Sequence, residues 1–144
     1  MTATRSRKEE ITYQKHRAKK KSPVCDFCVI TKNDDQFVKE GIYFIIIRNI
    51  FSYSIWDGQD VIDHLMLVPK KHTDSLSTLP KAAAEEYVKT ISGYEKDGYN
   101  IYARAPSSVI KSITHQHTHF IKTHGKPKNF VFLLRAPYYI RFIV

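Results

Sequence analysis

The chain has 144 residues, which suits one domain with a substantial buried core. Hydrophobic residues make up 42% and charged residues 26% of it, a composition typical of a soluble globular protein. No apolar run approaches the ~20 residues that a membrane-spanning helix needs, and the basic N-terminus lacks the apolar stretch of a secretory signal. These features argue against a membrane or secreted protein, and we expect a cytoplasmic one.

The formal net charge is +9 and is concentrated near the N-terminus. Residues 1–21 hold two acidic side chains, Glu9 and Glu10, against eight basic ones, which are Arg5, Arg7, Lys8, Lys15, Arg17, Lys19, Lys20 and Lys21. Residues 1–24 are therefore interpreted as a basic N-terminal arm with a short helix around Glu9–Lys20, which Pro23 ends. Such an arm is either a solvated terminus or a surface that attracts an anionic partner such as a nucleic acid.

After the arm, the pattern predicts strands separated by turn-rich segments. In chain order these are a turn-rich knuckle at Cys25–Asp35, one or two strands within Val38–Ile50, a loop at Ser52–Asp60 and a short strand at Asp63–Val68. Pro69 closes the last of these strands.

A long helix is predicted over Pro80–Lys96. Pro80 suits a first helical position, and Gly98 is a natural stop. Its apolar residues recur at helical spacing and predict one buried face, made of Ala84, Tyr87, Val88, Ile91 and Tyr94.

The remaining segments read as strands around one loop. They are strands at Tyr99–Ala103, Ser112–Lys122, Asn129–Leu134 and Tyr138–Val144, with a loop at Pro106–Lys111. Strands, then one long helix, then strands predict an α+β fold with an antiparallel sheet of about five strands. We expect residues 25–144 to form a single domain.

Three histidines alternate along the strand that is predicted before residue 122. His115, His117 and His119 are separated by Gln116 and Thr118, so their imidazoles project from one face of a strand. Histidine can transfer protons near neutral pH, bind metals and act as a nucleophile. The alternative reading is a solvent-facing polar strand or an adventitious metal-binding patch.

The run His115–Ile121 resembles the H-φ-H-φ-H-φ-φ signature of the histidine triad (HIT) superfamily. Three further stretches are similar to that family in the same order: Cys25-Asp26-Phe27-Cys28 to the C-x-F-C knuckle of many bacterial members, His64–His72 to the H-φ-φ-φ-φ-P-K-R-H segment, and Ser112 to the serine of S-x-x-H-x-H. The resemblance covers roughly residues 25–122 and implies a HIT-like fold.

The resemblance also implies a reaction and roles for single residues. Family members attack the α-phosphorus of a nucleotide with the middle histidine and then hydrolyse the nucleotidyl-histidine. On this basis His117 is the nucleophile, with further site residues that line or donate to the phosphate, which are His64, Ser112, His115 and His119. Asn49 lies where members hold the ribose hydroxyls. Nucleotidyltransferase members carry Gln in place of the third histidine, so His119 implies the hydrolase branch.

Three features depart from the family pattern. Gln116 and Thr118 replace apolar residues, so that face either is less deeply packed or contacts something polar. The Gly-rich approach with its Gln is replaced by residues 105–111, so Lys111 is the substitute for a phosphate contact. Asn49 and His64 lie 15 residues apart, wider than the family spacing, which leaves two other candidates for the ribose contact, Asp57 and Asp60.

Cys25 and Cys28 form a C-x-x-C pair. A thioredoxin-like context for redox chemistry is absent from the sequence, and a reducing compartment disfavours a structural disulfide. Two isolated thiols packed at a turn remain one reading. The resemblance implies the other, a structural zinc site completed by His72 and His115.

Three functions remain open at this point. The first is hydrolysis of a dinucleoside polyphosphate or a nucleoside phosphoramidate. The second is a nucleic-acid-associated activity, either DNA deadenylation or cap hydrolysis. It is favoured by the basic arm and by four aromatic residues, which are Tyr13, Trp56, Tyr138 and Tyr139. The third is non-catalytic nucleotide binding. The resemblance also implies a homodimer, with Pro80–Lys96 and adjacent strands as candidate interface surfaces.

Overall fold

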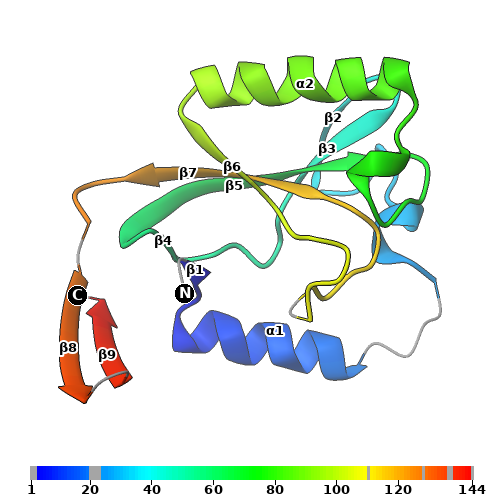
Figure 1. Ribbon diagram of the computed structural model, residues 1–144. Helices are drawn as coiled ribbons and strands as arrows, with labels where there is room; N and C mark the ends of the chain where they lie inside the picture. Colours follow the sequence, from blue (N-terminus) through cyan, green and yellow to red (C-terminus); the bar gives the residue numbers. More distant parts are fainter. Residues whose placement is uncertain (1–2, 20–23, 110, 128, 136–137, 144) are drawn as a thin grey trace.

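The computed structural model describes residues 3–19, 24–109, 111–127, 129–135 and 138–143 (Figure 1). The elements in chain order are β1 (Ala3–Thr4), α1 (Arg7–Lys19), the 3-10 turn η1 (Asp26–Val29), β2 (Phe37–Glu40), β3 (Phe44–Arg48), β4 (Ile55–Trp56), β5 (Gln59–Pro69), the 3-10 turn η2 (Leu76–Thr78), α2 (Lys81–Lys96), β6 (Tyr99–Ala103), β7 (Thr118–His124), β8 (Asn129–Arg135) and β9 (Tyr138–Ile143). Across these described ranges, no helix has the length and apolar character needed to cross a membrane.

One antiparallel sheet organises the molecule around β5. Its strand order is β1-β4-β5-β3-β2, while β7 pairs with β5 on the other side and β6 pairs with β7. Strands β8 and β9 form a separate hairpin. The α+β class and the antiparallel sheet that the sequence predicts are confirmed. The two additional strands, β1 and β4, are only two residues long each.

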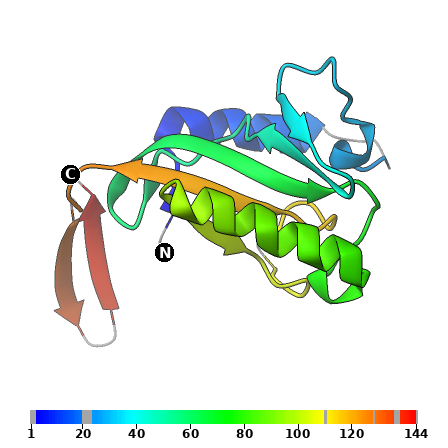
Figure 2. The same cartoon turned by 90° about the horizontal axis from the view of Figure 1, so that it is seen from above.

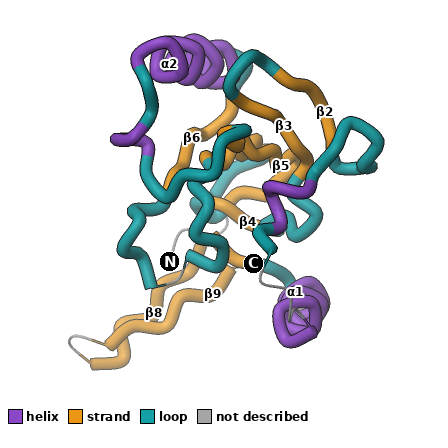
Figure 3. The backbone as a smooth tube through the Cα atoms, turned by 90° about the vertical axis from the view of Figure 1, so that its right-hand side faces the viewer, coloured by secondary structure: helices purple, strands orange, loops and turns teal. Residues whose placement is uncertain are grey.

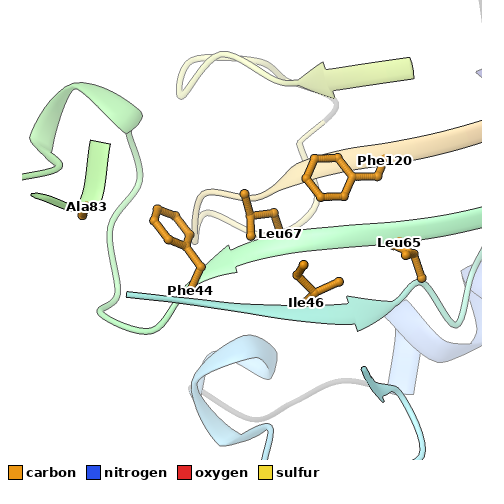
Figure 4. Packing of buried hydrophobic residues seen from close by; sticks show 6 residues of the cluster. All are labelled: Phe44, Ile46, Leu65, Leu67, Ala83 and Phe120. Atoms are coloured by element: carbon orange, nitrogen blue, oxygen red, sulfur yellow. The ribbon is translucent and has the colours of Figure 1, made fainter. Parts of the chain in front are cut away.

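The two helices lie on opposite sides of this sheet (Figures 1 and 3). Helix α2 covers one face, as the view from above shows (Figure 2). The buried cluster beneath it, drawn in Figure 4, consists of Phe44, Ile46, Leu65, Leu67, Ala83 and Phe120. The second face carries a smaller cluster of Phe27, Ile45, Ile47, Met66 and Val68. Alternate residues of β3 and β5 therefore point to opposite faces, so both faces of the sheet centre are buried.

Helix α2 begins one residue after the predicted start, because Pro80 takes the extended position that precedes the first helical turn. Ala83, Tyr87 and Ile91, at helical spacing, face the sheet as members or neighbours of the core. The prediction that Val88 belongs to the buried face is wrong, since Val88 is 57% exposed. A step of one residue from Tyr87 turns a helical side chain by about 100°, toward solvent.

The segment Ser52–Asp60, predicted to be a loop, contains a hairpin instead. Residues Ile55 and Trp56 form β4 and pair with the first residues of β5 across the turn Asp57-Gly58. Both turn residues have positive φ, 48° and 79°, as tight two-residue hairpin turns require. The hairpin lengthens β5 beyond its predicted start at Asp63 and accounts for the wide sequence spacing between Asn49 and His64.

The histidine strand begins later than predicted. Strand β7 starts at Thr118, opposite Leu67, so Ser112–His117 precedes it. The partner strand ends at Pro69, which has no amide hydrogen to continue the ladder. The amide of Gln116 instead donates to the carbonyl of Thr73 at 2.6 Å.

The N-terminal segment folds onto the face of the sheet opposite α2. Helix α1 starts two residues before the predicted Glu9, and Lys20 lies outside the described residues. Ser6 caps the helix in a reciprocal pair with Glu9: the Glu9 amide donates to Ser6 Oγ at 3.3 Å, and the Ser6 amide donates to Glu9 Oε2 at 2.9 Å. The rings of Tyr13 and His16 pack against Phe51.

Candidate active site and metal cluster

Three buried histidines meet on the sheet face opposite α2. His64 comes from β5, His119 from β7, and His117 from the extended residues just before β7. They are 2%, 5% and 7% exposed, respectively. His64 Nε2 lies 2.9 Å from His119 Nδ1, and the ring centroids of His117 and His119 lie 4.9 Å apart. The predicted grouping of these side chains on one face is thus present in the structure.

The tautomer of His117 follows from its hydrogen bond. Its Nδ1 lies 2.9 Å from the backbone oxygen of His115, and a carbonyl oxygen can only accept, so Nδ1 donates. The neutral ring then keeps a lone pair on Nε2. Burial lowers the pKa of His117, an effect that the hydrogen bond to His115 opposes and the charges of Lys111 and Arg104 reinforce. His117 is therefore neutral at pH 7, with Nε2 available as a nucleophile.

His64 and His119 form a directed pair. The amide of Tyr53 donates to His64 Nδ1 at 3.2 Å, so the proton of His64 is on Nε2 and is donated to His119 Nδ1. His119 in turn carries its own proton on Nε2. Burial lowers the pKa of His64 to about 3, and burial is also the main reason why the pKa of His119 lies well below its ordinary value. The pair offers a neutral N–H donor beside His117.

Asn49 lies next to His64 despite their separation in sequence. The backbone N–H of Asn49 donates to the backbone carbonyl of His64 at 2.9 Å, and the side-chain Nδ2 of Asn49 lies 3.2 Å from His64 Nε2. The alternatives are in other places: Asp57 is in the β4–β5 turn, and Asp60 is opposite His124 on β5. Proximity to the histidines favours Asn49 over both, and its contact with a ribose stays a prediction.

Lys111 and Ser112 lie in the loop before His115. The amino group of Lys111 donates to the carbonyl of Asp74 at 3.1 Å and to Gln116 Oε1. Ser112 is exposed. The predicted contacts of these two residues with a phosphate stay predictions.

The two polar residues between the histidines are buried, and Thr118 faces α2. Thr118 Oγ1 lies 3.0 Å from the hydroxyl of Tyr87, and Gln116 Nε2 donates to the carbonyl of Arg104 at 3.4 Å. Of the two readings that the sequence allowed, contact with something polar is the one observed.

Two arginines near the histidines, Arg5 and Arg104, were not predicted from the sequence to belong to the site. Arg104 follows β6, and its charge acts on His117 and His119. Arg5 holds its guanidinium carbon 4.2 Å from the ring centroid of Tyr13 and donates from Nε to the carbonyl of Phe51 at 3.2 Å. Strand alternation from Tyr102 could have indicated Arg104, whereas nothing in the sequence ties Arg5 to this face.

Four predicted metal ligands come together at the other end of the histidine segment. The ligand atoms of Cys25, Cys28, His72 and His115 all lie within 4.8 Å of one another. His115 Nε2 donates to the carbonyl of Pro69 at 3.0 Å, which leaves the Nδ1 lone pair directed toward both sulfurs, each 3.5 Å away. His72 Nδ1 lies 3.3 Å from Cys28 Sγ. This group could bind a metal ion.

The donor set fits a tetrahedral soft or borderline cation. Both cysteines are free rather than joined in a disulfide. Burial and the neighbouring Cys25 raise the pKa of the Cys28 thiol, because two thiolates in contact repel one another. A divalent cation removes this repulsion and stabilises both thiolates.

Comparison with known proteins bears on the fold. The sequence matches no protein-family model and no curated protein. Among solved structures, a HIT family hydrolase from Legionella pneumophila Philadelphia 1 is 20% identical, with a TM-score of 0.51 over 72% of this chain and 94% of that one. A HIT family hydrolase from Clostridium thermocellum is 17% identical, with a TM-score of 0.53 over 73% of this chain and 94% of that one. The protein therefore has the fold of histidine triad proteins.

Proposed function

We propose that the protein is a member of the HIT superfamily and a nucleotidyl hydrolase that cleaves a nucleotide conjugate at its α-phosphate. The observation that carries this proposal is the fixed tautomer of buried His117, with Nδ1 donating to the His115 carbonyl and Nε2 left unprotonated. A phosphoryl centre needs a neutral nucleophile and hydrogen-bond donors around its oxygens. The likeness in fold to proteins described as HIT family hydrolases supports the same reaction class.

The proposed reaction has two displacements. His117 Nε2 attacks the α-phosphorus, a P–N bond forms, and the bond to the leaving group breaks with its electron pair going to the leaving group. A phosphate leaves as an anion, whereas an amine leaves after taking up a proton from the solvent. The imidazolium that forms on His117 keeps its Nδ1–H donated to the His115 carbonyl, a hydrogen bond that strengthens as positive charge develops. Water then attacks the phosphorus and loses a proton to the solvent, the P–N bond breaks with its electron pair returning to His117 Nε2, and a nucleoside monophosphate leaves with His117 neutral again.

The other site residues bind and orient in this scheme. His119 donates its Nε2 proton to a phosphate oxygen, and His64 keeps His119 in the required tautomer through the 2.9 Å hydrogen bond. Asn49 faces the ribose, while Ser112 and Lys111 approach the phosphate from the preceding loop. Both dinucleoside polyphosphates and nucleoside phosphoramidates satisfy this chemistry.

For the metal cluster we propose a zinc ion held by Cys25, Cys28, His72 and His115. The ion, when bound, supplies a structural cross-link between η1, the loop after β5 and the histidine segment. It has no part in the displacements, because the Nδ1 atom of His115 would be a ligand. His115 thus contributes to the reaction through its carbonyl oxygen, which orients His117.

The basic helix α1 favours a second candidate, a nucleotide attached to a nucleic-acid end. Helix α1 lies on the histidine side of the sheet (Figure 1), and four of its basic side chains are exposed: Arg7, Lys8, Lys15 and Arg17. Binding of DNA or RNA should then weaken steeply as salt rises. Lys8→Gln with Lys15→Gln should reduce both the affinity and its dependence on salt, and salt-independent binding would exclude this candidate.

A homodimer is proposed as well. Strand β6 has one sheet partner, β7, among the described strands, so its other edge is available to pair with a second copy beside α2. Light scattering on a sizing column should give twice the monomer mass of 16.8 kDa.

The experiment that tests the hydrolase proposal is turnover by three proteins. Wild type should release a nucleoside monophosphate from a dinucleoside polyphosphate or a nucleoside phosphoramidate. His117→Asn should lower kcat by at least about 10⁴-fold. The matched control is His124→Asn at the exposed end of β7, which should keep wild-type turnover. Tight binding of a nucleoside monophosphate without hydrolysis would contradict the proposal and identify a nucleotide-binding protein.

A further inference from the structure

Arg104 extends the active-site face of the sheet by one residue beyond β6. Strand β6 pairs with β7 in the register Tyr102↔His119 and Ala103↔Thr118, so the next pair in this register is Arg104 opposite His117. The ring of Tyr102 stacks on His119 at 5.9 Å, which assigns Tyr102 to the histidine face. Because side chains alternate along an extended chain, Arg104 lies on the same face as Tyr102.

Contacts of Arg104 agree with this direction. Its guanidinium carbon lies 5.2 Å from the ring centroid of Tyr102, and the residue is half-buried. The ion pairs recorded for the described residues join Arg5 to Glu10, Lys32 and Lys70 to Glu40, and Arg48 to Asp63, and none involves Arg104. Among the described residues, then, no carboxylate is ion-paired with Arg104, and its positive charge acts on the histidine site.

Two cationic side chains bring more positive charge to this site than one singly charged phosphate requires. The charge of Arg104 acts on His117 and His119, and that of Lys111 acts on His117 from the loop side. His64 and His117 are neutral and Arg5 is paired with Glu10, so these three add nothing to this surplus. A guanidinium presents a planar fork of donors that matches a phosphate in two hydrogen bonds. An α-phosphate in a phosphoramidate carries a single negative charge, so a second phosphoryl group would complement this surplus.

We propose that Arg104 is a specificity-determining residue that binds a second phosphoryl group of the substrate, next to the phosphate that His117 attacks. The inference rests on the proposed function and narrows its substrate class. A phosphoanhydride, in which the leaving group is itself a phosphate, is the preferred substrate, and a phosphoramidate with an amine leaving group is a poor one.

Two substrates with the same nucleoside test this inference. We expect Arg104→Gln to lower kcat/KM for diadenosine triphosphate by about 100-fold and for adenosine 5′-phosphoramidate by less than about 3-fold. The control is Lys89→Gln, which removes one positive charge from α2 on the opposite face of the sheet and should change neither value. Equal losses on both substrates, or no loss on the triphosphate, would overturn the inference. Arg104→Lys provides a second variant should the glutamine variant fail to fold.

Binding separates this inference from the proposed reaction. Calorimetric titration with AMP and ADP needs no turnover, and Arg104→Gln should weaken ADP by at least about 10-fold and AMP by less than about 3-fold. A wild type that hydrolyses neither substrate but shows this difference would refute the hydrolase proposal and leave the role of Arg104 standing. Equal weakening of AMP and ADP, or none, would refute the role of Arg104.

Discussion

His115 and His117 are two residues apart and have opposite tautomers. In His115 the carbonyl of Pro69 holds the proton on Nε2, and Nδ1 faces the sulfurs of Cys25 and Cys28. In His117 the carbonyl of His115 holds the proton on Nδ1, and Nε2 keeps the lone pair. Two identical side chains on one segment therefore present different nitrogens, one toward a metal cluster and one toward the buried histidine site.

The surroundings of the two sites differ as well. We call the metal cluster of Cys25, Cys28, His72 and His115 the cluster end, and the group of His64, His117 and His119 the buried end. The metal cluster includes exposed Cys28 and exposed His72, whereas His64, His117 and His119 are all at most 7% exposed. A backbone carbonyl at each end selects the tautomer, so neighbouring histidines can differ in role without any change of residue type. We therefore propose that the cluster end stabilises the fold and that the buried end carries the chemistry.

The largest effect is expected at the cluster end. Replacing Cys25 and Cys28 together by Ser should remove the metal and lower the free energy of unfolding by at least about 3 kcal/mol, since structural zinc contributes directly to folding. Elemental analysis and urea denaturation measure the two quantities. A chelator should reproduce the loss in wild type and have no effect on the variant. Wild type without metal, or a variant of unchanged stability, would contradict the structural role.

A change at the buried end should lower turnover and leave the metal bound. His64→Ala removes the donor to His119 Nδ1 and should lower kcat by about 100-fold, or about 2.7 kcal/mol, while the metal content stays constant. His124→Ala serves as the control. Loss of metal in His64→Ala would show that the two ends are not independent.

Acid should lower the free energy of unfolding, because the buried histidines resist protonation. The pKa of His64 is lowered to about 3 by burial, and that of His119 is lowered as well, whereas an unfolded histidine titrates near its ordinary pKa of 6.5. Below pH 6.5 the unfolded chain therefore binds more protons than the folded one, and the free energy of unfolding falls as pH falls.

The expected slope is about 1.4 kcal/mol per pH unit for each such histidine, with no contribution above pH 7.5 or so. Urea titrations between pH 4.5 and 8 measure this slope. His64→Gln should reduce it by the contribution of one histidine, about 1.4 kcal/mol per pH unit. An unchanged slope in this variant would mean that His64 is not buried in its neutral form.

The smallest effect tests how α1 supports the buried end. Ser6 caps α1, and its amide donates to Ser54 Oγ at 2.7 Å, next to the Tyr53 amide that orients His64. Ser6→Ala should lower the free energy of unfolding by about 1 kcal/mol. The control is Ser92→Ala, at an exposed position of α2, with an expected change in the free energy of unfolding below about 0.5 kcal/mol. Equal effects of both would argue against a docked α1.

Local patterns were sufficient for the parts of the molecule that depend on neighbours in sequence. Helix α2 and β6 lie at their predicted bounds within one residue, and alternation correctly grouped His117 with His119. The start of β7 was not predictable in this way, because it depends on where the partner strand β5 ends at Pro69. The hairpin at Asp57-Gly58 was missed because its two-residue strand β4 is too short for a period of two to register.

The site shows the same division. The metal cluster follows from the quoted motifs, since each ligand lies within one of them. The contributions of Tyr53 and Arg104 depend on a backbone amide and on strand register, which a sequence without its pairing does not specify. Asn49 likewise lies beside His64 although the β4–β5 turn separates them in sequence, and this proximity comes from backbone pairing.

We expect His117, and neither His115 nor His119, to become covalently attached to the nucleotide. Wild-type protein mixed rapidly with a dinucleoside polyphosphate, or with a nucleoside phosphoramidate, and quenched at alkaline pH should yield a peptide that carries a nucleoside monophosphate on His117. The adduct should be absent from His117→Asn. An adduct on His115 or His119, or turnover with no adduct on any of the three, would contradict nucleophilic attack by His117.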